Sequence, residues 1–397
     1  ARTEAGHRIY SRRDIDIVKW LVARQEEGLR IGRAVELWRS LEQEDQDPLR
    51  RMPLLSESAS VPTGNKTEDL RDEWISACLA FDDRHADRIL TQSFGFFSPE
   101  VVVLEIIQEG IAEIGRRWYD GEATVQQEHF ASRLAMRRLE TLIISAPRPT
   151  RRGRILIACP PDEEHVIGPS ILAFLLRRAG WDVVYLGADV PLGQMEQTVS
   201  ATKPDLAILA AQQLHTAANL LEMTELLHRE GVSTAFGGGI FNRIPALRKR
   251  IPGHFLGRTL NEALEETERL IVRTTPAPGI EGLADTYKEA LSHYNDRRLT
   301  VEAQVLQSLD APDLEPKVVH EVSTAFGNAL QAALRFGDMD LLNHHVDWVE
   351  HRNGHQEVWS KALQDVMETY YEATANQLDE RGAPIVAWFV ERARQQE

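Results

Sequence analysis

A short segment around His165 carries side chains suited to holding a metal. In Glu163-Glu164-His165-Val166-Ile167-Gly168 a carboxylate stands two residues before an imidazole. A neutral imidazole donates one ring nitrogen to a metal, and its other N–H needs an acceptor that fixes the tautomer. Glu163 is a suitable acceptor, so the pattern predicts that His165 is a metal ligand. The alternative interpretation is a loop histidine paired with a surface glutamate.

The elements around this segment predict a parallel sheet. Residues 154–159 form a short apolar run followed by a loop and a helical pattern, and this alternation recurs three times. The later units begin at Trp181, Pro204 and Val232, and a weaker fifth strand is expected at 254–257. Repeated strand–helix units predict a doubly wound sheet whose ligands lie beyond the carboxyl ends of the strands. The histidine segment follows the first strand, at that edge.

The rest of the chain is helical in pattern, which predicts a multidomain α and α/β protein. Residues 1–43 are arginine-rich helices, and residues 44–67 form a polar linker rich in Pro and Ser. Short loops within 68–150 predict an antiparallel four-helix bundle. Residues 151–275 form the sheet domain, and 276–397 form a further helical domain.

Composition narrows the class of protein. The net charge of −16 disfavours nucleic-acid binding by most of the chain. Two cysteines in apolar contexts argue against a disulfide framework and favour a reducing cytoplasm. There is no apolar run long enough to span a membrane, and the polar start lacks the apolar stretch of a signal peptide. We therefore expect a cytoplasmic protein without a membrane segment.

With its sheet context, the histidine segment resembles the cobalamin-binding family, as does Leu186-Gly-Ala-Asp-Val-Pro191 after the second strand. The resemblance implies a helical bundle joined to a flavodoxin-like, Rossmann-type domain, with His165 replacing the cofactor's own base beneath cobalt. It also implies a set of cofactor-binding residues, namely Glu163, His165, Gly168, Ser170, Gln212, Gly237 and Gly238. The family often has Ser-x-Leu after the third strand. Here Gln212-Gln213-Leu214 stands there, so contacts to the nucleotide tail are expected to differ.

Trp118 is followed after nine residues by Glu128-His129, a spacing that resembles the MerR-type adenosylcobalamin photoreceptors. The resemblance implies that Trp118 packs against the adenosyl group and that Glu128 and His129 line the same pocket. Light would cleave the cobalt–carbon bond and change conformation and self-association. Some members supply a histidine directly after the tryptophan as a new upper ligand. Tyr119 stands there, which argues against that adduct, unless His129 takes the role. The alternative is a core tryptophan and a solvated helix start.

Residues 1–11 resemble the wing of a MerR-type DNA-binding domain, without the helix-turn-helix that enters the major groove. Whether that motif was cut away or lost is left open. A wing alone predicts at most weak, salt-sensitive contact with phosphates. DNA binding by this chain is therefore not expected.

The last 120 or so residues carry histidines and tryptophans at helical spacing, among them His344, Trp348, His351 and His355. A dimerising helical bundle explains them without a ligand. The order of all the segments, however, resembles the photocobilins. That resemblance implies biliverdin between the sheet domain and residues 280–397, bound non-covalently because this domain has no cysteine. The arginines available for its propionates are Arg297, Arg298, Arg335 and Arg352.

Four functions were weighed on these residues. The favoured one is a light sensor that binds adenosylcobalamin, with biliverdin as the second chromophore, and that has no enzymatic activity of its own. A corrinoid carrier for methyl transfer shares the bundle, the sheet and the histidine. A light-dependent MerR-type repressor requires the missing helix-turn-helix. An adenosylcobalamin mutase needs a substrate barrel of roughly 250 residues, for which the chain has no segment.

Overall fold

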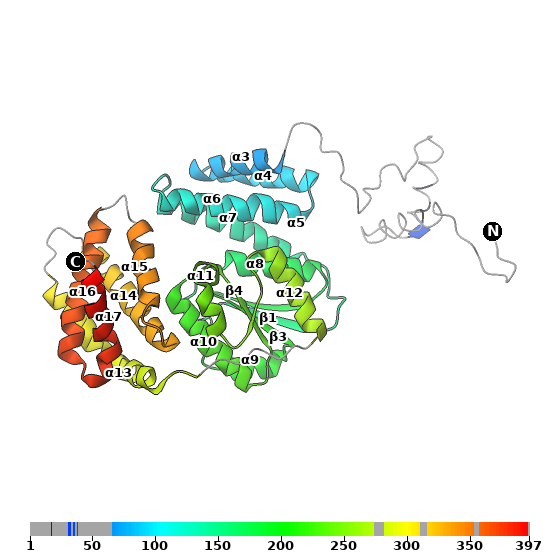
Figure 1. Cartoon of the computed structure of the whole chain (residues 1–397). Coiled ribbons are helices and arrows are strands. Elements are labelled where there is room, and N and C mark those ends of the chain that lie inside the picture. The colour runs from blue at the N-terminus through cyan, green and yellow to red at the C-terminus, as the bar shows by residue number, and fades with distance from the viewer. Residues whose placement is uncertain are drawn as a thin grey trace. The chain divides into compact units, whose positions relative to one another are not determined.

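The computed structural model describes residues 66–273, 282–309, 316–352 and 357–395, with five isolated positions before residue 66 (Figure 1). The chain divides into two units, residues 1–66 and 67–397. The expected wing, the arginine-rich helices and the linker therefore lie almost entirely outside the described residues.

Residues 67–144 form the expected four-helix bundle. The helices are α3 (Thr67–Leu79), α4 (Asp83–Phe96), the continuous α5 (Pro99–Val101), η2 (Val102–Gln108) and α6 (Glu109–Tyr119), and α7 (Val125–Ile144). Asp82 caps α4, and Thr124 with Gln127 forms a capping box at α7. Trp74 is fully buried in the bundle core, and a Cβ at Gly110 would lie 2.7 Å from its ring. Glycine thus allows the α3 and α6 backbones to approach closely.

One residue departs from the helical spacing of the bundle sequence. Phe81 lies in register with Trp74 and Cys78, which predicts that all three share a helix face. In the structure α3 ends at Leu79, and Phe81 has a φ of 57° and is 51% exposed. Its ring packs edge-on against Phe130 instead, with the ring centroids 5.3 Å apart. The turn after α3 therefore ends the periodicity.

A five-stranded parallel sheet follows, as expected. Its strands are β1 (Arg154–Ala158), β2 (Asp182–Gly187), β3 (Leu206–Ala210), β4 (Thr234–Gly237) and β5 (His254–Phe255), in the order β2-β1-β3-β4-β5. The connecting helices are α8 (Ile167–Arg178), α9 (Met195–Thr202), α10 (Leu214–Arg229), α11 (Gly239–Arg243), η3 (Pro245–Arg250) and α12 (Leu260–Arg273). This is the flavodoxin-like strand order.

Alternate residues of each strand enter two different cores, because successive side chains point to opposite faces of a sheet. Leu156 and Leu209 share a core with α9 and α10, whereas Ile155 and Ile157 share one with α8 and α12. Both faces are therefore covered, which explains why the inner strands β1 and β3 are apolar at nearly every position rather than alternating.

The helix α8 joins the bundle to the sheet. It presents Ile171, Phe174 and Leu175 to the bundle core, where each is at least 95% buried. Arg178 forms an ion pair with Glu100 of α5 at 2.7 Å. The helix that begins just after His165 is thus fixed from both sides.

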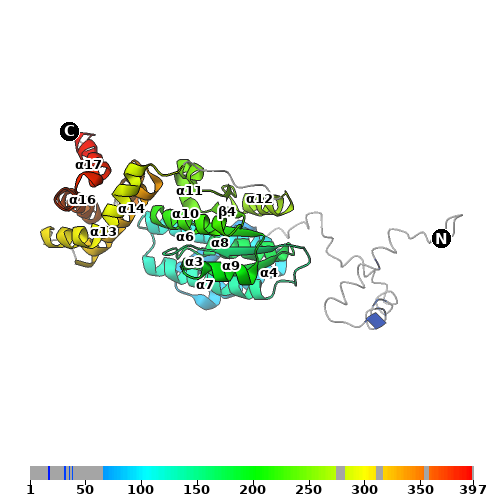
Figure 2. The same ribbon diagram turned by 90° about the horizontal axis from the view of Figure 1, so that it is seen from below.

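The C-terminal residues form a helical domain. Its helices are α13 (Asp285–Ser308), α14 (Pro316–Phe336), α15 (Leu341–Arg352), α16 (Glu357–Gln377), η4 (Glu380–Gly382) and α17 (Ala383–Gln395). α14 packs along α10, beside which it lies in Figure 2, and the two share one continuous apolar core. Arg335 of α14 also contacts Glu222 of α10 at 3.0 Å.

Candidate functional site

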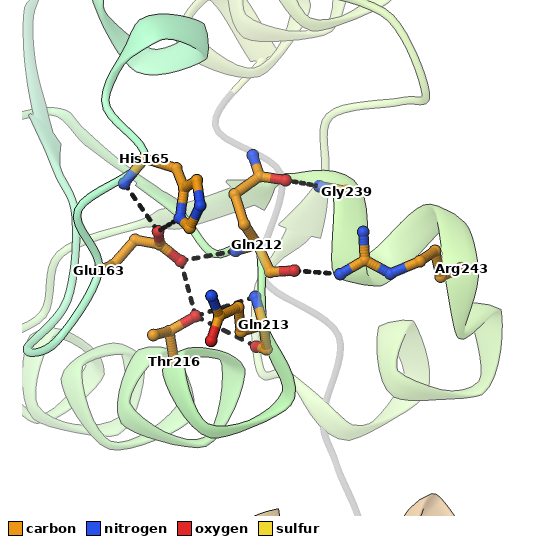
Figure 3. A network of polar contacts seen from close by, with 7 residues as sticks. All are labelled: Glu163, His165, Gln212, Gln213, Thr216, Gly239 and Arg243. Atoms are coloured by element: carbon orange, nitrogen blue, oxygen red, sulfur yellow. Dashed lines mark hydrogen bonds and ion pairs between the residues drawn. The ribbon is translucent and has the colours of Figure 1, made fainter. Parts of the chain in front are cut away.

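Three loops meet at the carboxyl-terminal edge of the sheet, after β1, β3 and β4 (Figure 3). The first carries Glu163 and His165, the second Gln212, and the third Gly238 and Gly239. Because the strand order reverses beside β1, this edge lies at the switch point where open α/β sheets bind ligands.

Glu163 is the centre of the site, with its side chain only 1% exposed. Oε1 accepts hydrogen bonds from Nδ1 and from the backbone N–H of His165, at 2.6 and 2.9 Å. Oε2 accepts from the Gln212 backbone N–H and from the Thr216 hydroxyl, both at 2.6 Å. Burial acts to raise the pKa of Glu163, but these four donors outweigh it and hold the pKa below its ordinary value. The carboxylate is thereby kept ionised.

The imidazole of His165 is oriented by that carboxylate. The contact through Nδ1 assigns the ring proton to that nitrogen, which leaves Nε2 as a lone-pair donor. The side chain is 57% exposed, so Nε2 is accessible. The hydrogen bond with Glu163 raises the pKa of His165, against the opposing effect of burial. These are the features of a metal-ligating histidine with its orienting partner.

The segment after β2 holds the histidine loop in place. Asp189 has a φ of 45°. Its N–H donates to the Glu163 carbonyl at 3.1 Å, and its carboxylate accepts from the Asp162 N–H at 2.9 Å. Asn219 of α10 donates to the Pro161 carbonyl and to the Asp162 carboxylate. The Leu186–Pro191 motif thus acts by bracing the loop that carries His165.

The glycines of the site differ in whether an added Cβ atom would collide with neighbouring atoms. A Cβ at Gly168 or Gly237 has no atom within 4 Å, so both positions border open space. Gly238 has a φ of 120°, and a Cβ there would lie 2.0 Å from the Ala211 carbonyl oxygen. Its role is therefore to let the backbone after β4 approach the backbone after β3, whereas no close contact requires a glycine at Gly168 or Gly237.

Gln212 and Ser170 differ in burial. The Gln212 side-chain oxygen accepts from the Gly239 N–H at 2.8 Å, at the open edge. Ser170 is fully buried and donates to the Tyr185 hydroxyl at 2.9 Å. Tyr185 in turn donates to the Val166 carbonyl at 3.4 Å. Ser170 is thus held in the interior beneath the loop rather than at the surface, and its predicted contact with a cofactor stays a prediction.

The residues predicted in the bundle lie at the end of α6 and near the start of α7. Glu128, near the start of α7, accepts from Ser132 at 2.6 Å and contacts Nδ1 of His129 at 2.9 Å. Glu128 also acts electrostatically to raise the pKa of His165, which places the two within Coulombic range. His129 is 75% exposed, and Trp118 is half-buried in the last turn of α6. The adenosyl contacts expected of these residues stay predictions.

Two site residues were missed in the sequence: Thr216, which donates to Glu163, and Arg243, which donates to the Gln212 carbonyl. Thr216 stands in the first turn of α10, two residues beyond the Gln212-Gln213-Leu214 segment. A hydroxyl in the first turn after β3 was the available clue. For Arg243, in the short α11, the sequence held no clue.

The residues expected to hold biliverdin are mostly engaged with one another. Arg298 contacts Glu302, Gln331 and Asn328. Arg335 pairs with Glu222, Arg297 is exposed, and the side chain of Arg352 lies outside the described residues. His344 is exposed on α15, but the side chains of Trp348 and His351, and all of His355, lie outside the described residues.

Two cavities border the C-terminal domain. One of about 100 Å³ lies between α10 and α14, with polar walls that include Asp162, His215, Asn328 and Gln331. It is smaller than the roughly 300–1,000 Å³ of ordinary ligand pockets. The other, of about 380 Å³, lies between η3 and the start of α15. Within the described ranges no cluster of three or more His, Cys, Asp or Glu side chains is arranged to hold a metal ion.

Two segments match family models, each described as a B12 binding domain. Residues 70–143 match the first and residues 153–265 the second. They fall inside the expected segments 68–150 and 151–275, whose boundaries stay predictions. The bundle and the sheet domain therefore each contain a segment that is similar to a B12 binding domain.

The named relatives of the chain include transcriptional repressors and corrinoid proteins. The chain is 29% identical over 261 residues to the HTH-type transcriptional repressor CarH of Myxococcus xanthus, covering 64% of this chain and 84% of CarH. It is 30% identical over 208 residues to the repressor CarA of the same organism, covering 52% of this chain and 64% of CarA. The trimethylamine corrinoid protein of Methanosarcina barkeri is 24% identical over 203 residues, covering 48% of this chain and 92% of that protein. These similarities support cobalamin binding. Among the described helices, none is long and apolar enough to cross a membrane.

Proposed function

We propose that this chain is a light sensor that binds adenosylcobalamin between its bundle and its sheet edge. The observation that carries the proposal is the pairing of His165 with Glu163, which leaves the Nε2 lone pair available on a side chain that is 57% exposed. When bound, adenosylcobalamin supplies a cobalt–carbon bond that visible light cleaves. The similarity to the repressors CarH and CarA supports a regulatory rather than an enzymatic role.

The residues of this chain perform separate tasks in that proposal. Glu163 holds the proton on Nδ1 of His165, so that Nε2 carries its lone pair toward the metal. Thr216 and the Gln212 N–H fix the carboxylate in turn. Trp118 offers a flat apolar wall, and the carboxylate of Glu128 can accept hydrogen bonds from ribose hydroxyls.

A change at the bundle wall is the proposed output. Loss of a group packed on Trp118 removes its contacts, so the end of α6 and the start of α7 shift to a second arrangement. The sheet side stays fixed, because Glu163 is saturated with donors. A shift confined to the bundle would alter self-association through its outer face.

Biliverdin is proposed as a second chromophore, held non-covalently at the boundary between the sheet domain and α13–α17. The support is the order of the segments, together with imidazoles and guanidinium groups at that boundary. His215 and His345 interact there, and burial lowers the pKa of His345 to about 4. A cavity of about 100 Å³ requires the boundary to open for a bilin.

The test is an absorption spectrum of protein prepared in the dark with adenosylcobalamin and biliverdin, before and after green light. A cobalamin spectrum that changes on illumination, beside a far-red bilin band, is expected. Light-responsive cobalamin without that band would leave a single-chromophore sensor. A spectrum that light does not change would refute the sensor.

A corrinoid carrier is the second candidate, favoured by the similarity to the trimethylamine corrinoid protein. It requires the same His165 site but makes no use of Trp118. Turnover with a methylamine-type donor and its methyltransferase would support the carrier. A light-dependent repressor remains the third candidate, and its DNA-binding residues would lie outside the described part of the chain.

A further inference from the structure

The guanidinium of Arg243 lies at the open edge of the site and is not hydrogen-bonded to any carboxylate of the described residues. Its Nη2 donates to the Gln212 carbonyl, and it makes no ion pair within the residues that the structure describes (Figure 3). Glu163 lies within Coulombic range, but the oxygens of that carboxylate are already bonded to His165, Gln212 and Thr216. The charge of Glu163 thus partly balances that of Arg243, but the guanidinium N–H groups beyond the bond to Gln212 have no acceptor among the described residues.

The backbone around Arg243 is built to hold the guanidinium in place. A Cβ on Gly239 would lie 2.5 Å from the Gln212 side-chain oxygen and 3.4 Å from Nη1 of Arg243. The glycine thus lets the guanidinium lie over the turn after β4. Gln212 fixes both partners, because its side chain accepts from the Gly239 N–H and its carbonyl accepts from Arg243.

The chemical groups of cobalamin indicate which of them the Arg243 guanidinium would bind. Cobalamin carries neutral amides around its ring, and its one permanently anionic side group is the phosphodiester of the nucleotide tail. An arginine with N–H groups free beyond one anchoring bond matches a phosphate, which accepts charge-assisted hydrogen bonds in a two-pronged geometry. Gly237, with no atom within 4 Å of its Cβ position, leaves space at the same turn.

We propose that Arg243 binds the phosphodiester of the corrinoid's nucleotide tail and so selects complete cobalamins over corrinoids without the tail. The proposal rests on the cobalamin binding proposed above. Gln212, which stands at the serine position of the Ser-x-Leu pattern named in the sequence analysis, is the residue that positions Arg243. The difference between Gln212-Gln213-Leu214 and the Ser-x-Leu pattern is thus explained, because Gln212 positions Arg243.

The test compares adenosylcobalamin with adenosylcobinamide, which lacks the phosphate, ribose and base, by equilibrium titration in the dark. Arg243→Gln is expected to weaken adenosylcobalamin binding by about 10-fold or more, the loss typical of a hydrogen-bonded charge pair. Its affinity for adenosylcobinamide should match that of the unaltered protein. Arg243→Lys, which keeps the charge, should lose less. The control is Lys249→Gln, which removes an exposed cation from the neighbouring η3 turn and should change neither affinity.

Salt separates phosphate from the rest of the tail. The selectivity of the unaltered protein for adenosylcobalamin over adenosylcobinamide should fall as ionic strength rises, and that of Arg243→Gln should not. Equal losses for both corrinoids, no loss for either, or salt-independent selectivity would overturn the assignment of Arg243. If the unaltered protein binds neither corrinoid, the proposed function itself fails.

Discussion

The sheet edge and the C-terminal domain both gather charged side chains, but they use them in opposite ways. At the sheet edge, four donors converge on Glu163 so that His165 and Arg243 are each left with unused bonding capacity. In the C-terminal domain, the N–H groups of Arg298 donate hydrogen bonds to Glu302, Gln331 and Asn328. The network around Glu163 leaves donor and acceptor groups that a ligand can use. The network around Arg298 uses its hydrogen-bonding groups within the domain, so its contribution is to stability.

Removal of His165 should have the largest effect. His165→Ala deletes the proposed cobalt ligand, and we expect cobalamin affinity to fall by more than about 100-fold, since loss of even an orienting partner typically costs 10–100-fold. The measurement is a titration followed by the visible spectrum of the corrinoid. His344→Ala, at an exposed position on α15, is the control. Unchanged affinity and an unchanged spectrum would remove His165 from the site.

Glu163→Gln should have the second largest effect on cobalamin affinity. The glutamine amide keeps one acceptor oxygen. Its NH₂ group, however, replaces the other carboxylate oxygen and faces hydrogen-bond donors that it cannot bond. We expect cobalamin affinity to fall about 10–100-fold and the free energy of unfolding to fall by about 2 kcal/mol or more. Glu164→Gln removes the neighbouring exposed carboxylate and should do neither. Equal behaviour of the two variants would contradict the central role of Glu163.

The same pair predicts a pH window for stability of the cofactor-free protein. The pKa of Glu163 is lowered by folding, so its contribution is present above the unfolded value of about 4.3 and is lost as pH falls through the folded value. The pKa of His165 is raised, so its contribution is present below about 6.5 and is lost as pH rises through the folded value. The difference in melting temperature between the unaltered protein and Glu163→Gln should therefore be largest between about pH 4.3 and 6.5. A difference that is constant from pH 4 to 9 would count against the pair.

Trp118→Ala should have a smaller and more selective effect. The corrin would still be held by His165, but the preference for adenosylcobalamin over methylcobalamin should fall about 3- to 10-fold, the size of a lost aromatic contact. Trp118→Phe keeps a flat apolar wall and should retain most of the preference. If neither variant alters the ratio of the two affinities, Trp118 belongs to the bundle core alone.

Arg335→Gln should have the smallest effect. Its partner Glu222 is 42% exposed, and ion pairs of this kind contribute at most about 1 kcal/mol. Chemical denaturation should therefore show a loss below that figure, comparable to Lys317→Gln in the exposed pair with Glu321. A much larger loss would mean that the C-terminal domain depends on this contact with α10 and is not held mainly by its apolar core.

The contrast also explains what the sequence could predict. Glu163 and His165 are two residues apart, so local spacing alone identified the pair. Thr216 and Gln212 complete the same site from 53 and 49 positions along the chain, and only the strand order β2-β1-β3-β4-β5 brings them there. The number and type of strands followed from their apolar runs. The end of α3 before Phe81 did not, because a single turn with a positive φ cancels a periodicity that the side chains alone would continue.

The shared helix α8 has a consequence for how the molecule can be divided. The two segments that match B12 binding domain models are separate stretches of sequence, yet Ile171, Phe174 and Leu175 of the second complete the core of the first. A fragment ending near residue 150 would expose that apolar seam to water, and it should aggregate or fold incompletely. A fragment that keeps its cores intact should therefore carry the bundle and the sheet together, and it should also keep the C-terminal domain, because α10 shares one apolar core with α14.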